Sequence, residues 1–199
     1  MATTKSRRKA ASSFSDLVAS ELGRCWPRLI FAARFRAFPS GQPLQLPRVA
    51  LMMDRNKGKG MADLQRFIDA QWPLYDRVLA ELRAGQKRTH WMWFVFPQIE
   101  GLGSSAMALK YAIASREEAA AYLACPLLCG RLEECTALVN AIDGKSVYEI
   151  FGSPDDLKFH SSMTLFARVA KGRSLFAAAI EKYFDGRLDE ATLQRIGEA

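Results

Sequence analysis

Helix-start signals recur at short intervals along the chain after Met61. Ser115 with Glu118 and Ser146 with Glu149 have the spacing of capping boxes. In a capping box, the side chains of a serine and of a glutamate three residues later each accept a hydrogen bond from the other residue's backbone N–H. No run alternates polar and apolar residues over a strand's length, and no Asn-Gly or Asp-Gly pair joins two such runs. The sequence therefore predicts an all-α fold, a single compact domain of about eight short helices.

The strongest of these start signals is Ser153-Pro154-Asp155-Asp156. It offers a cap residue, a proline in the first turn and two acids at the positive end of the helix dipole, and the helix should reach Val169. The apolar run from Trp91 to Phe96 fits a buried strand or a buried helix. Because helices surround it, we expect a helix there.

The first 60 residues differ from the rest in charge and composition. The whole chain has a formal net charge of +7. Residues 1–60 hold 12 Lys and Arg against 3 Asp and Glu, whereas residues 61–199 hold 16 against 18. Since the folded part is slightly acidic, we expect it to have no general affinity for nucleic acid. The predicted organisation is a basic, unstructured leader over residues 1–60 and a helical domain over residues 61–199.

Three interpretations of the leader stay open. Its Arg-rich, Ser-rich composition is typical of an organelle transit peptide. Its repelling charges are also typical of a disordered basic arm. The third interpretation is a later translation start at Met52, Met53 or Met61. Only one helix, over residues 14–22, is expected before the prolines of this segment.

Composition also indicates which sites to expect. No apolar stretch approaches the roughly 20 residues that cross a bilayer, so we expect no membrane association. Cys125, Cys129 and Cys135 lack the close pairs of a zinc site, so neither a metal nor another cofactor is predicted. Without a disulfide framework or a secretory segment, a reducing, cytoplasmic location is expected, or an organellar one if the leader is a transit peptide.

Polar residues bracket the aromatic run. Lys87, Arg88 and His90 precede it, and the turn from Gly101 to Ser105 follows Gln98 and leads into a helix. Free amides and hydroxyls at such a turn can bind an anion, although an ordinary helix cap needs the same residues.

A second polar set lies in the helix after Pro154. Lys158, Ser161 and Ser162 share one side by helical spacing, and Thr164 lies on the adjacent stripe. Three hydroxyl residues within four positions need solvent, backbone carbonyls or a ligand as partners. We hypothesise that this stripe, the Lys87–His90 corner and the glycine turn form one pocket.

Four motifs in order carry a family resemblance. They are residues 87–98 (KRTHWMWFVFPQ), 101–105 (GLGSS), 150–158 (IFGSPDDLK) and 161–166 (SSMTLF). In these motifs the chain resembles the domain of unknown function 1810 family, over about Asp63 to Ile196. The resemblance implies an all-helical domain with no established reaction. Some members carry the label calpastatin, which does not suit this sequence, since such an inhibitor is a disordered chain with repeats.

Two functions are consistent with these patterns, and whether the protein is an enzyme stays undecided. The first is binding, with or without turnover, of a small phosphate-bearing or nucleotide-like ligand. His90 would be its acid or base, and Ser161 or Ser162 would be a nucleophile if His90 or Lys158 reached it. The alternative is a non-catalytic protein-interaction module whose aromatic run is core. The candidate ligand-binding residues are Lys87, Arg88, Trp91, Trp93, Gln98, Gly101, Gly103, Ser104, Ser105, Lys158, Ser162 and Thr164.

Overall fold

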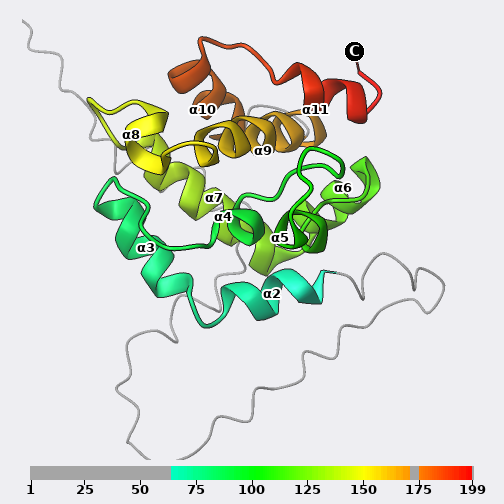
Figure 1. Cartoon of the computed structure of the whole chain (residues 1–199), viewed down its shortest axis with the longest axis horizontal. Coiled ribbons are helices and arrows are strands. Elements are labelled where there is room, and N and C mark those ends of the chain that lie inside the picture. The colour runs from blue at the N-terminus through cyan, green and yellow to red at the C-terminus, as the bar shows by residue number, and fades with distance from the viewer. Residues whose placement is uncertain (1–63, 171–174, 199) are drawn as a thin grey trace, which may run out of the picture. The chain divides into compact units, whose positions relative to one another are not determined.

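The computed structural model describes residues 64–170 and 175–198 (Figure 1). The leader, the helix expected at residues 14–22 and the first 3 residues of the predicted domain lie outside this part of the chain. Within it, every regular element is a helix, so the predicted all-α class is confirmed. The helices are α2 (Gln65–Gln71), α3 (Tyr75–Arg83), α4 (Met92–Val95), α5 (Ala106–Lys110), α6 (Arg116–Ala124), α7 (Pro126–Asn140), α8 (Val147–Phe151), α9 (Asp155–Val169), α10 (Leu175–Phe184) and α11 (Glu190–Arg195).

Local capping explains where several helices begin. The side chains of Ser105, Ser115, Ser146 and Asp189 each accept a hydrogen bond from a backbone N–H in the first turn of α5, α6, α8 and α11. At Ser146 the full capping box with Glu149 is present. These short helices are thus set by sequence-local bonds.

Two predicted caps are wrong in part. The N-cap of α9 is Pro154, which has no side-chain acceptor, so Ser153 does not cap the helix. Ser115 does accept from the Glu118 backbone, but the Glu118 carboxylate does not complete a box. It accepts instead from the Ala114 N–H at 2.7 Å and from the Arg66 guanidinium at 2.8 Å. A tertiary cation thus replaces the local partner.

The two longest helices, α7 and α9, organise the core (Figure 1). α7 contacts α3, α6 and α10, and α9 contacts α6, α8, α10 and α11. The aromatic run enters this core as expected: Met92–Val95 is helical, and Trp91 and Phe96 are fully buried. Phe96 packs edge-on against Phe159 of α9, with ring centroids 5.0 Å apart. The run therefore fixes α4 to α9.

A small backbone bridge holds the loop after the run. The Ile113 N–H donates to Gln98 O and the Glu100 N–H donates to Ile113 O, both at 2.8 Å. Ile99 and Ile113 are both buried. The glycine turn between them is thus closed at its base. None of the helices in residues 64–170 and 175–198 is long and apolar enough to cross a bilayer.

Candidate functional site

Glu81 of α3 holds the Lys87–His90 corner in place. Its carboxylate accepts from the backbone N–H groups of Arg88 (2.8 Å) and Thr89 (3.1 Å), from the Thr89 hydroxyl (2.7 Å) and from the Trp91 indole N–H (2.8 Å). Burial raises the pKa of Glu81, but these bonds outweigh burial and lower it to about 2. The corner is therefore built on a buried, ionised carboxylate.

Lys87 and Lys158 meet at one carboxylate. Asp155 lies in the first turn of α9. Its Oδ2 atom is 2.7 Å from Lys87 Nζ, and its Oδ1 atom is 2.7 Å from Lys158 Nζ. Desolvation raises the pKa of Asp155, but the bonds from Lys158 and Lys87 together outweigh it, so the net pKa lies below the ordinary value. All three side chains are mostly buried, with 8%, 15% and 19% of Lys87, Asp155 and Lys158 exposed. The cluster has one uncompensated positive charge.

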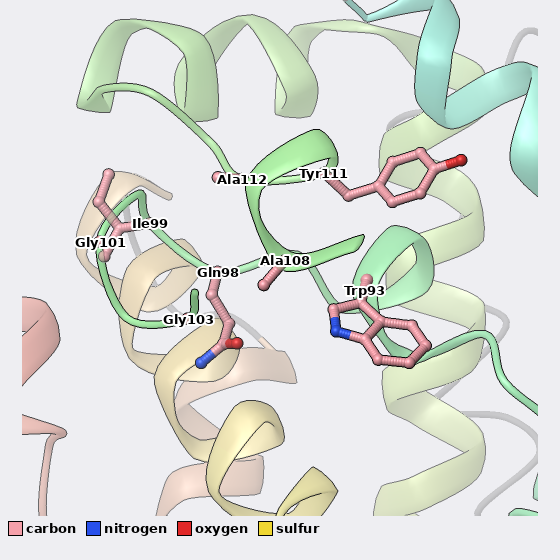
Figure 2. Close-up of a pocket in the computed structure, with 8 residues that line it drawn as sticks. All are labelled: Trp93, Gln98, Ile99, Gly101, Gly103, Ala108, Tyr111 and Ala112. Carbon is pink, nitrogen blue, oxygen red and sulfur yellow. The ribbon is translucent and has the colours of Figure 1, made fainter. Parts of the chain in front are cut away.

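Trp93 contacts the ammonium group of Lys158 and also lines a hollow. Lys158 Nζ stands 4.7 Å from the centroid of the Trp93 ring, a cation–π contact. Trp93, Gln98, Gly101 and Gly103 line a hollow with a cavity volume of about 10 Å³, together with Ala108 and Tyr111 (Figure 2). In Figure 2 the loop that carries the two glycines curves around Gln98. We call these residues, with Lys87, Asp155 and Lys158, the Lys158 site.

Conformation and close packing explain why residues 101 and 103 of the turn are glycines. Gly101 has φ +88°, and a Cβ atom there would overlap the Arg195 guanidinium. A Cβ atom at Gly103 would lie 2.7 Å from the Cβ of Ala108. No backbone N–H from Gly101 to Ser105 donates to another described residue. The backbone N–H groups of the turn are thus available to donate to a ligand, and the Arg195 guanidinium lies close to Gly101.

Several predicted ligand residues lie away from this arrangement. Trp91 is fully buried and its indole N–H is bonded to Glu81, so a ligand cannot stack on its ring in this conformation. The Arg88 side chain is exposed and donates to Gln86. His90 and Ser104 are exposed, and Ser105 serves as the cap of α5. The proposed function therefore gives the side chains of these five residues no ligand contact.

The hydroxyl stripe of α9 is buried rather than open to a ligand. Ser161 Oγ donates to Leu157 O at 3.1 Å, and Thr164 Oγ1 accepts from the Asp189 N–H at 3.0 Å. Ser162 Oγ has no hydrogen-bond partner among the described residues. Because Ser161 bonds the helix backbone, the structure forms no pair of Ser161 with His90, as a nucleophile and its base would require.

Three side chains of this region were not predicted from the sequence. The sequence predicts Asp155 only as a helix-start acid and predicts no role for Glu81 or Arg195. Asp155 contacts Lys87, and Arg195 lies against Gly101, across long sequence separations that no local spacing signals. The bonds of Glu81 span 7 to 10 residues, which is beyond one helical turn. No cluster of three metal-ligating side chains occurs in residues 64–170 and 175–198.

Comparison with known proteins identifies a family. No curated protein matches the chain. The crystal structure of the conserved hypothetical protein Rv1873 from Mycobacterium tuberculosis is similar, with 56% sequence identity and a TM-score of 0.67. The match covers 68% of this chain and 96% of that chain. The family model described as "Protein of unknown function (DUF1810)" matches residues 61–196, and the chain therefore belongs to the DUF1810 family.

Proposed function

We propose that the protein binds a small phosphate-bearing ligand at the Lys158 site. The observation that carries this proposal is that two mostly buried ammonium groups, Lys87 and Lys158, share the single carboxylate of Asp155. A cluster with surplus positive charge, shielded from water, attracts an anion more strongly than an exposed lysine does. The free amides of the glycine turn supply further donors.

The size of the hollow limits what part of a ligand can enter. A cavity volume of about 10 Å³ is close to the room for one water molecule. A phosphate oxygen fits this space, whereas a nucleoside base does not. A nucleotide-like ligand would therefore place a phosphate at the hollow and its base outside. Since Lys158 already covers the Trp93 ring, stacking on Trp93 would require Lys158 to move.

Binding, rather than turnover, is the activity that we propose. Ser161 lacks an activating base, and none of the other described hydroxyls at the site is bonded to a histidine.

We further propose a cytoplasmic location, which fluorescence microscopy of a C-terminally tagged chain would test. A signal confined to an organelle would contradict that location and favour the transit-peptide interpretation.

A thermal-shift titration with inorganic phosphate and adenosine monophosphate tests the function. We expect saturating ligand to raise Tm by roughly 5 °C. Lys158→Gln should abolish most of this rise. Arg77→Gln, which also removes one cation but at an exposed position on α3, should preserve it. If neither ligand shifts Tm, or if both variants respond like the unmodified chain, the proposal is wrong.

A further inference from the structure

A second hollow, larger than the Lys158 site, lies where α3 and α7 end. Its cavity volume is about 290 Å³, at the lower edge of the range for small-molecule sites. Its walls are mainly apolar and come from Leu82, Ala84, Leu138, Ala141 and Ile142. We call it the Gly85 groove. It is independent of the proposed function.

Gly85 keeps the groove open. The residue has φ +65°, and a Cβ atom there would lie 3.1 Å from Lys145 Nζ and 3.5 Å from the Cγ2 of Ile142. Any larger residue would therefore push a side chain into the groove as well as strain the turn. Lys145 Nζ donates to Gly85 O at 2.9 Å, which fixes an ammonium group at the edge of the apolar wall.

The charge around the groove is positive. Arg83 is 59% exposed and its only acidic neighbour among the described residues, Glu134, is 3.9 Å away. Of the residues that line the groove, Arg83 and Lys145 are cations and none is an acid. The C-terminal ends of α3 and α7 repel an anion, because the helix dipole places at most about half a negative charge at each end. Lys145 on Gly85 O and Lys182 on the carbonyls of Asn140 and Ile142 offset this opposition.

We propose that the Gly85 groove binds a small amphipathic carboxylate. Its apolar chain would lie on Leu138 and Ile142, and its carboxylate would face Lys145 and Arg83. The apolar wall supplies affinity through buried area, and the fixed ammonium selects the sign of the head group. The cavity volume of about 290 Å³ suits one apolar chain better than the apolar face of a helix.

Titration of the full chain with octanoate, followed by amide chemical shifts, tests this proposal. Octanoate should cause saturable shifts at Leu82, Gly85 and Ile142. Octylammonium, with the same chain and the opposite charge, should bind roughly tenfold more weakly, because an attraction becomes a repulsion. Acetate, which lacks the chain, should cause no saturable shift. Equal binding of octanoate and octylammonium would overturn the proposal, as would no binding of octanoate.

Two pairs of variants locate the site. Ala141→Phe fills the groove and should abolish octanoate binding, whereas Ala124→Phe, at an exposed position on α6, should not. Lys145→Gln should weaken octanoate binding a few-fold and leave octanol binding unchanged, and Lys145→Arg should restore the octanoate affinity. If an acidic leucine-containing peptide binds the groove and octanoate does not, the occupant is a protein and the proposal is wrong.

Discussion

Glu81 shows how one buried residue can organise a polar corner. The residue is 8% exposed. Its carboxylate accepts four hydrogen bonds, one from Arg88, two from Thr89 and one from Trp91. A carboxylate with this many donors is stabilised in its ionised form. Its sequence neighbours gave no sign of this role, since Glu81 lies in a helix with an ordinary amphipathic pattern.

We expect Glu81→Gln to lower the free energy of unfolding by roughly 1.5 to 3 kcal/mol, because charge-assisted bonds are lost from a buried site. The pKa of Glu81 in the folded protein is about 2, below its ordinary value of 4.5. Its ionisation therefore stabilises the fold fully above pH 4.5, and this contribution falls as the pH drops toward 2.

Urea unfolding at about pH 6 and about pH 3.5 measures this effect. The difference in unfolding free energy between the unmodified chain and Glu81→Gln should shrink at the lower pH. Glu100→Gln, at an exposed position, provides a control and should change little at either pH. A difference that stays constant between the two pH values would show that Glu81 does not act through its charge.

At the scale of elements, local signals were enough to predict most helices. The capping box at Ser146 begins α8 as expected, because it acts within one helical turn. The contacts of the candidate site could not be predicted in this way. Lys87 and Asp155 are far apart in sequence, and only the packing of α9 against α4 and α8 brings them together.

The same contrast explains the hydroxyl stripe. Helical spacing correctly put Ser161 and Ser162 beside Lys158 on α9, but spacing does not say what covers that side. The structure buries both serines, so the interpretation in which the stripe faces water is wrong. Burial depends on the neighbouring helices, which a single helix's sequence does not encode.

The glycine turn gives a prediction at this scale. We expect Gly101→Ala to destabilise the protein by more than Gly144→Ala. Both positions have positive φ, and nothing lies within 4 Å of a Cβ atom at Gly144, whereas one at Gly101 meets the Arg195 guanidinium. The excess should be small, because this guanidinium ends an exposed, flexible side chain that can move aside. The backbone term alone is about 1–2 kcal/mol. Thermal unfolding of the two variants measures the excess.

Arg195→Ala provides the control, because it removes the guanidinium that a methyl group at position 101 would meet. In that background the two glycine-to-alanine substitutions should cost nearly the same free energy. If the excess at Gly101 persists without Arg195, the close approach between the turn and α11 is not its cause.

For the whole molecule, the helical domain should fold without the leader. The family match begins at residue 61, and the described helices share one core. We expect a chain that starts at Met61 to unfold in one cooperative thermal transition. Its circular dichroism spectrum should be helical, like that of the full chain. An unfolded product would show that residues before Met61 are needed for the fold.

The central claim for the molecule is that Lys87 and Lys158 form an anion site that Asp155 partly neutralises. Isothermal titration of inorganic phosphate into the unmodified chain and into Asp155→Asn tests it directly. Removal of the carboxylate charge frees both lysines, so phosphate should bind about threefold to tenfold more tightly to the variant. Equal or weaker binding to a variant that remains folded would contradict the claim.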